Sequence, residues 1–288
     1  MNELPPLFDV NGWFGLPYNG EPEFPTASAL LAHMDRLGVG RSLAWHVLAR
    51  DMHAPTGNRR LLKDIDAVPG ARDRLIPAFS ISPSMPYEKN GMAEYEAAFR
   101  GGRVRALRLL MASQRLSWDM VMPIVEPIAS FRPVILADIR QTPDLAGMVR
   151  FAERFPDIPL VLTHSMWPQQ STVMDLMRRC PNVLCDISWM HVMGVIELLS
   201  RQFGAERVVF GLGSRAHQGA AIAALVQANI PEAQRDLIAH GNMDRLLRLE
   251  PTPRYRSSLL EDPKRPLWKK IIRRESMDVD VVDAHGHM

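Results

Sequence analysis

The sequence predicts a single (β/α)8 TIM barrel, in which eight parallel strands alternate with helices, followed by a C-terminal extension. Short runs rich in Val, Ile and Leu alternate with amphipathic segments from residue 7 to about residue 249. Most of these runs lack polar alternation, as expected for strands that are covered on both faces. A chain of 288 residues is long enough for such a barrel. A doubly wound open sheet is the alternative, because periodicity alone does not show that a sheet closes.

The expected strands and helix ends can be placed along the chain. The strands are 7–10, 43–48, 75–81, 104–110, 133–138, 159–164, 182–187 and 207–212. Thr26 is suited to cap the first helix and Gly38 to end it. Thr142, followed by Pro143 and Asp144, predicts another helix start with Thr142 as the cap.

The composition changes after Leu249. Residues 250–280 contain several prolines and basic side chains, which predicts a linker or surface extension with one short helix over 267–274. The final residues, 281–288, form an isolated His-x-His strand that has the form of the start of a second barrel. We therefore divide the chain into a barrel (1–249), an extension (250–280) and this strand (281–288).

Charge and hydropathy exclude several classes of protein. A net charge of +2 gives no reason to expect a nucleic-acid or membrane partner. No apolar run approaches the ~20 residues that a membrane span needs, and no signal peptide is apparent. Cys180 and Cys185 flank a short turn that holds them apart, so we expect reduced thiols and a cytoplasmic protein.

In a barrel of this kind the chemistry lies at the carboxyl ends of the strands. His164 and Asp186 stand at two such ends and are candidate catalytic residues. The candidate substrate-binding residues at the other ends are Arg108, His46, Asn11 and Trp13. Further aromatic residues near strand ends that are suited to line a pocket are Trp45, Trp167 and Trp189. Arg108 is suited to bind an anion if its side chain faces into the barrel, and both orientations remain open.

Several motifs carry a family resemblance. They are Phe8-Asp9-Val10-Asn11-Gly12-Trp13-Phe14-Gly15, Leu160-Val161-Leu162-Thr163-His164, Asn182-Val183-Leu184-Cys185-Asp186-Ile187-Ser188, Phe210-Gly211-Leu212-Gly213-Ser214 and Gly241-Asn242-Met243-Asp244-Arg245-Leu246-Leu247. Over residues 7–249 the chain resembles the amidohydrolase-related family, in the branch that includes aminocarboxymuconate-semialdehyde decarboxylase. The resemblance implies a barrel with a divalent metal and a dimeric assembly.

The family's metal ligands are mostly replaced. Its ligand positions fall on Asn11 and Trp13 in the first strand, Ala137 in the fifth and Gly213 in the eighth. Only the sixth-strand histidine, His164, is kept, together with Asp186. A divalent ion needs three or four good ligands, and alanine and glycine have no donor side chain. We therefore expect no metal in the barrel.

His285 and His287 follow the same frame at the end of the sequence. Alternate residues of a strand point the same way, so both imidazoles are suited to face one ion. They begin a second barrel, or they fold back or swap into a partner to complete a site with His164 and Asp186, or they have no role. These three interpretations remain open.

The sequence favours an amidohydrolase-related barrel that has lost its metal ligands and is inactive as a metal hydrolase on its own. It would act as a small-anion-binding domain or as a partner domain, need no cofactor, and pair with a second copy as a homodimer or with a homologous active barrel. The alternative is a hydrolase or decarboxylase that uses zinc or manganese on a small carboxylate or amide. In that alternative His285 and His287 supply part of the ligand set.

Overall fold

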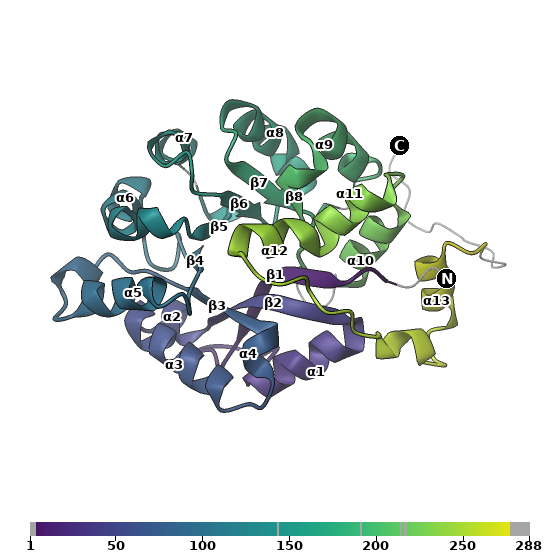
Figure 1. Ribbon diagram of the computed structural model, residues 1–288, viewed down its shortest axis with the longest axis horizontal. Coiled ribbons are helices and arrows are strands. Elements are labelled where there is room, and N and C mark those ends of the chain that lie inside the picture. The colour runs from purple at the N-terminus through teal and green to yellow at the C-terminus, as the bar shows by residue number, and fades with distance from the viewer. Residues whose placement is uncertain (1–3, 143, 191, 214, 216–217, 277–288) are drawn as a thin grey trace.

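The computed structural model confirms the predicted barrel (Figure 1). It describes residues 4–142, 144–190, 192–213, 215 and 218–276. One sheet of eight parallel strands runs in sequence order, and helices surround it. The strands are β1 (Leu7–Phe14), β2 (Val39–His46), β3 (Leu75–Phe79), β4 (Ala106–Leu109), β5 (Val134–Asp138), β6 (Leu160–Thr163), β7 (Val183–Asp186) and β8 (Val208–Val209).

The helices occupy the stretches between strands and the C-terminal end of the described chain. The α-helices are α1 (Ala27–Leu37), α2 (Leu48–Asp51), α3 (Ala54–Asp66), α4 (Ala71–Arg74), α5 (Gly91–Arg100), α6 (Trp118–Val125), α7 (Leu145–Arg154), α8 (Gln170–Arg179), α9 (Val195–Phe203), α10 (Gln218–Gln227), α11 (Glu232–Asp236), α12 (Asn242–Leu247) and α13 (Pro266–Arg273). Short 3-10 turns are η1 (Met85–Tyr87), η2 (Glu126–Phe131), η3 (Ile139–Gln141), η4 (Trp167–Gln169), η5 (Ala205–Arg207) and η7 (Ser258–Glu261), and η6 (Leu237–Gly241) is a π-helical turn.

The predicted helix ends are confirmed for α1 and wrong for α7. Thr26 Oγ1 accepts a hydrogen bond from the Ala29 N–H at 3.1 Å, and Gly38 ends α1 with a left-handed φ of 79°. Helix α7 is instead capped by Asp144, whose Oδ1 accepts from the Gly147 N–H at 2.7 Å. Thr142 donates its hydroxyl to the Asp138 carbonyl at 2.9 Å, so it ends the preceding turn and does not start the helix.

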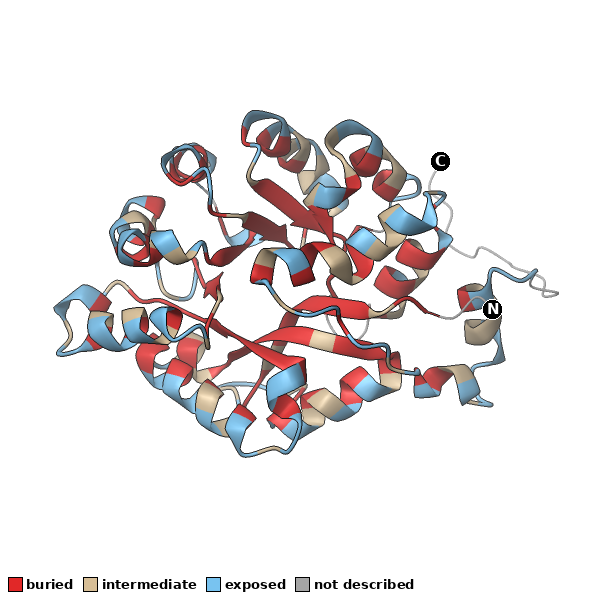
Figure 2. Cartoon of the chain, viewed as in Figure 1, coloured by how far each residue is buried: buried red, intermediate tan, exposed pale blue. Residues whose placement is uncertain are grey.

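Two apolar cores lie on either side of the strands, and Figure 2 shows that the strands themselves are mostly buried. The inner one fills the barrel with side chains such as Phe8, Leu43 and Leu136, and the outer one lies between the strands and the helices. Along β5, Leu136 therefore faces inward and Ala137 faces the helices. The same alternation turns Asp138 toward the barrel interior at the carboxyl end of the strand.

The amino ends of the strands are closed by α12. Met243 and Leu247 belong to the inner core, and Asn242 Nδ2 donates to the carbonyls of Ala205 and Val208, at 2.8 Å in each case. These contacts explain the Asn-Met-Asp motif of the sequence as a structural one. In the part of the chain that the structure describes, the barrel is therefore open to a ligand at the opposite end.

The extension runs back along the outside of the barrel, beside α1 and α10 (Figure 1). A Cβ at Gly40 would lie 2.1 Å from the Pro253 carbonyl oxygen, so only glycine lets the two backbones approach this closely. The short helix expected over 267–274 is present as α13. The predicted His-x-His strand at 281–288, with His285 and His287, lies outside the described residues.

The sequence also predicts reduced cysteines and no membrane-spanning segment. Cys180 and Cys185 are buried free thiols, as expected. Across the described part of the chain, no helix is both long and apolar enough to cross a bilayer.

Candidate active site

A cavity of about 700 Å³ lies at the carboxyl ends of the strands. Residues that line it include Asn11, Trp13, Trp45, Arg108, Asp138, Arg140, His164 and Trp189. Four of the six residues proposed from the sequence are thus brought together there, namely Asn11, Trp13, Arg108 and His164. Asp186 lies beneath them and contacts two of them. His46 is not in this lining, because it packs edge-on against Phe14 with its Nε2 3.6 Å from Asp64.

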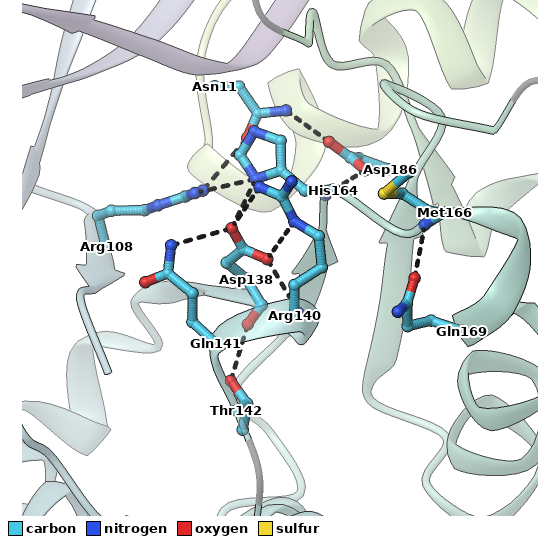
Figure 3. A network of polar contacts seen from close by, with 10 residues as sticks. All are labelled: Asn11, Arg108, Asp138, Arg140, Gln141, Thr142, His164, Met166, Gln169 and Asp186. Atoms are coloured by element: carbon cyan, nitrogen blue, oxygen red, sulfur yellow. Dashed lines mark hydrogen bonds and ion pairs between the residues drawn. The ribbon is translucent and has the colours of Figure 1, made fainter. Parts of the chain in front are cut away.

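Arg108 points into the barrel mouth, which settles the orientation that the sequence left open. Its Nη1 donates to Asn11 Oδ1 at 3.2 Å, and its Nη2 lies 3.3 Å from His164 Nδ1 (Figure 3). The residue is 5% exposed, and among the described residues its Nε has no hydrogen-bond partner. A guanidinium carries five N–H donors, so this buried group retains donors for a ligand.

Three carboxylates surround the Arg108 guanidinium. Burial lowers the pKa of Arg108, and the negative charges of Asp138, Asp186 and Asp9 act in the opposite direction. The arginine stays ionised because its ordinary pKa lies far above neutrality. It is therefore a fixed positive charge at the floor of the cavity.

Asp138 is held by a second arginine. Arg140 donates to it through Nε at 3.1 Å, Nη2 at 2.9 Å and its backbone N–H at 2.9 Å. Burial alone would raise the pKa of Asp138, but hydrogen bonds from His164 and Arg140 hold that pKa well below its usual range. Asp138 is thus a permanent carboxylate, and Arg140 adds a second fixed positive charge at the mouth.

His164 has a strained backbone and a ring between two charges. Its φ is 57°, a left-handed value that costs a non-glycine residue roughly 1–3 kcal/mol and clusters at functional sites. Asp186 Oδ1 accepts from the His164 backbone N–H at 3.1 Å and so holds this conformation. His164 Nδ1 lies 3.3 Å from Asp138 Oδ2, the same distance as from Arg108 Nη2.

These two contacts define two protonation states of His164. A guanidinium only donates, so the neutral ring accepts from Arg108 at Nδ1 and carries its proton on Nε2. The ring protonated at both nitrogens donates from Nδ1 to Asp138 instead. Each state has a partner in place, which is what a residue that exchanges a proton requires.

Asp186 supports the site from below. Its Oδ2 accepts from Asn11 Nδ2 at 2.5 Å. A Cβ at Gly211 would lie 2.6 Å from both Asn11 Nδ2 and Asp186 Oδ2, so glycine is required at that position for the contact to form. Burial raises the pKa of Asp186. Asp186 therefore orients Asn11 and His164 without lining the cavity itself.

Asp9 should make the stability of the fold depend on pH. Burial raises its pKa from 3.8 to about 6, against hydrogen bonds from Leu212, Asn11 and Ser42 that lower it. The folded chain then holds this proton more tightly than the unfolded chain, so the stabilising contribution is present at low pH and is lost as the pH rises toward 6. We expect Asp9→Asn to remove this loss.

The relative stability of the Asp9→Asn variant should therefore change between pH 4 and pH 7. From pH 4 to pH 7, the free energy of unfolding of the variant should rise by on the order of 2 kcal/mol relative to that of the wild type. Asparagine can keep the contacts to Leu212 and Ser42, because its amide both donates and accepts. Urea unfolding at the two pH values measures this difference, and parallel curves for both proteins would contradict it.

Tryptophans form the walls of the cavity. Trp13 and Trp45 stack with ring centroids 6.1 Å apart and an interplanar angle of 27°. The Arg140 guanidinium lies 5.5 Å from the centre of the Trp189 ring. Flat aromatic walls beside cationic groups suit a planar, negatively charged ligand. Trp167, in contrast, is 71% exposed and lies outside the lining.

The described residues do not fit a divalent ion. The sequence placed the fifth-strand ligand position on Ala137, but Ala137 faces the helices and the mouth residue is Asp138, which Arg140 already binds. At Gly213 a Cβ would lie 3.0 Å from Trp189 Nε1, so the ring occupies the space that an acidic side chain there would need. No group of three or more His, Cys, Asp or Glu suited to a metal occurs among the described residues.

Comparison with solved structures shows which proteins share this fold. Solved structures with the same fold include a 5-carboxyvanillate decarboxylase from Sphingomonas paucimobilis, at 18% identity and TM-score 0.63 over 85% of this chain and 99% of that one. A 2,6-dihydroxybenzoate decarboxylase from Rhizobium has 12% identity and TM-score 0.65 over the same shares of the two chains. A dihydroxybenzoic acid decarboxylase from Polaromonas, solved with manganese and 2-nitroresorcinol, has 13% identity and TM-score 0.64 over 85% and 97%.

The sequence was compared with individual curated proteins and with models of whole families, and the two comparisons gave different results. No curated protein matches the chain. The amidohydrolase family model matches residues 26–249, which is most of the barrel. The chain therefore belongs to the amidohydrolase family.

Proposed function

We propose that the protein is an enzyme that acts on a small aromatic carboxylate, most simply as a decarboxylase. Arg108 binds the carboxylate and His164 transfers the proton. The observation that carries the proposal is the contact between the buried Arg108 guanidinium and the His164 imidazole at the floor of the mouth cavity. The fold shared with decarboxylases supports an enzyme over the inactive binding protein that the sequence favoured, although the enzyme that the sequence offered as its alternative is metal-dependent.

The choice of ligand follows from the chemistry of the cavity. A guanidinium binds a carboxylate through two parallel N–H donors, and Arg108 has five, of which Nη1 contacts Asn11 and Nη2 contacts His164 while Nε has no partner among the described residues. The stacked Trp13 and Trp45 rings offer a flat apolar surface for the rest of the molecule. A cavity of about 700 Å³ is large enough for a substituted benzene ring.

The proton transfer can be written with the groups present. The His164 ring, protonated at both nitrogens and facing Asp138 through Nδ1, donates its Nε2 proton to the substrate ring carbon that bears the carboxylate, and a new C–H bond forms. The bond from that carbon to the carboxylate then breaks, its electron pair returns to the ring, and CO2 leaves. His164 regains a proton from water. Arg108 orients the carboxylate, and Asp138 stabilises the His164 ring when it is protonated at both nitrogens.

A metal-dependent reaction is the second candidate. It is favoured by the manganese in the Polaromonas enzyme and in a 5-carboxyvanillate decarboxylase from Novosphingobium aromaticivorans. Since the described donor set does not fit an ion, this candidate needs ligands from elsewhere, and His285 and His287 are the proposed source. A homodimer or a homologous active barrel is the proposed assembly in either case.

Turnover of the two acids named in the structural comparisons tests the proposal. Purified full-length protein is incubated with 2,6-dihydroxybenzoate or 5-carboxyvanillate, and CO2 release and the decarboxylated product are followed by mass spectrometry and chromatography. We expect product from at least one acid, or from a related hydroxybenzoate. Tight binding of these acids without CO2 would support the inactive anion-binding protein instead. Neither binding nor turnover across a hydroxybenzoate panel would contradict both interpretations.

A further inference from the structure

The charges at the barrel mouth form a compact set. Arg108 and Arg140 carry two positive charges, which is the charge of one divalent ion. They face the carboxylates of Asp138, Asp186 and Asp9. Arg108 is 5% exposed, and the Asp138 side chain that Arg140 binds is 4% exposed. Arg108 and Asp138 must be compensated by partners, because burying an unpaired charge costs several kcal/mol, whereas the Arg140 side chain is 36% exposed at the rim.

The position of the Arg108 guanidinium matters more than the count of charges. One of its nitrogens contacts Asn11, at the first-strand position where the family has a histidine ligand, and another contacts His164, the retained sixth-strand histidine. The guanidinium therefore lies between two of the family's ligand positions. A cation held by residues 11 and 164 would have to displace it.

The neighbouring residues are arranged to match a guanidinium and not an ion. Asn11 presents its amide oxygen to Arg108 and its amide nitrogen to Asp186, and an amide nitrogen is not a metal ligand. Both carboxylate oxygens of Asp138 accept from Arg140. Trp189 fills the space next to Gly213. Two of these positions thus bind guanidinium groups, and the third is blocked by a tryptophan ring.

We propose that the guanidinium groups of Arg108 and Arg140 take the place of the family's divalent ion, so that this centre is assembled and binds a carboxylate without metal. The inference concerns the same site as the proposed function. Its test needs no turnover, so the two can fail separately. One consequence is that chelators leave the centre intact, because its cations are part of the chain.

Chemical rescue distinguishes a guanidinium centre from a metal centre. In the full chain, His285→Ala/His287→Ala first removes the imidazoles that lie outside the described barrel. In that background Arg108→Ala should lower the melting temperature by on the order of 10 °C, because it leaves buried carboxylates uncompensated. Millimolar ethylguanidinium should restore part of the loss. Manganese or zinc chloride should restore less.

Two controls make the result specific. Arg105→Ala, just before β4, removes an arginine whose side chain donates, among the described residues, to the backbone carbonyls of Gly102, Leu247 and Arg248, and ethylguanidinium should not rescue it. Arg108→Lys keeps the charge, so its melting temperature should lie closer to that of the wild type. That result would show that the alanine variant is destabilised by the loss of charge.

The outcome that overturns the inference is equally direct. Elemental analysis and manganese titration of the parent protein carrying His285→Ala/His287→Ala should find far less than one ion per chain. If that protein holds about one tightly bound ion per chain, and His164→Ala releases it, the arginines do not replace the metal. Rescue of Arg108→Ala by manganese or zinc but not by ethylguanidinium would also contradict the inference.

Discussion

Replacing Arg108 by methionine should weaken the binding of a small aromatic carboxylate by about 100-fold or more. Two charge-assisted hydrogen bonds are lost, each contributing about 1.5–3 kcal/mol, and each 1.4 kcal/mol corresponds to tenfold in affinity. Isothermal titration with 2,6-dihydroxybenzoate measures the change. Methionine is similar in length and apolar, so the cavity keeps most of its shape while the donor group disappears.

The controls for Arg108 separate charge from geometry. Arg108→Lys keeps one positive charge and should bind with an intermediate affinity, because an ammonium lacks the planar pair of donors. Arg100→Met on α5 changes an exposed arginine whose side chain is 71% accessible, and it should bind like the wild type. Equal affinity for the wild type and Arg108→Met would mean that the carboxylate is bound elsewhere.

Replacing His164 by asparagine should lower kcat by about 10²- to 10⁴-fold, the usual contribution of a positioned proton donor. Asparagine tolerates the left-handed backbone at this position. Its amide oxygen can accept from Arg108 where the imidazole Nδ1 did. Binding of the carboxylate should therefore change little, while the proton carried by Nε2 is lost.

A lower kcat with unchanged affinity for the carboxylate in His164→Asn would identify His164 as the proton donor. His164→Ala should impair both, because alanine offers no acceptor to Arg108 and is strained at a φ of 57°. A kcat for His164→Asn within a few-fold of the wild type would show that another group donates the proton. Loss of binding in the asparagine variant would show that His164 positions the ligand instead.

The strands could be predicted from sequence because barrel strands are apolar throughout. All eight expected runs overlap an observed strand, although β1 extends to Phe14, β2 begins at Val39 and β8 is only Val208–Val209. The direction of individual side chains was harder to predict. An offset of one residue exchanges the two faces of a strand, which is why the ligand position was assigned to Ala137 when Asp138 faces the mouth.

The sequence predicts the part of the candidate site that lies on the strands or directly after them, but not the part that lies in the turn beyond β5. Asn11, Trp13 and Arg108 lie in the carboxyl-terminal halves of their strands and His164 follows β6, and the barrel brings such residues together. Arg140 was missed because it lies in the turn η3 beyond β5, and only its spacing of two residues from Asp138 hints at their ion pair. His46 also ends a strand, but it packs against Phe14 outside the cavity lining.

The most direct test of a carboxylate site built on arginine is a titration of metal-stripped protein. The full chain is treated with EDTA, exchanged into chelator-treated buffer, and titrated with 2,6-dihydroxybenzoate with and without manganese chloride. We predict the same affinity in both conditions, and its loss in Arg108→Met. Binding that appears only when manganese is added, and that survives Arg108→Met, would contradict the account and establish a metal centre.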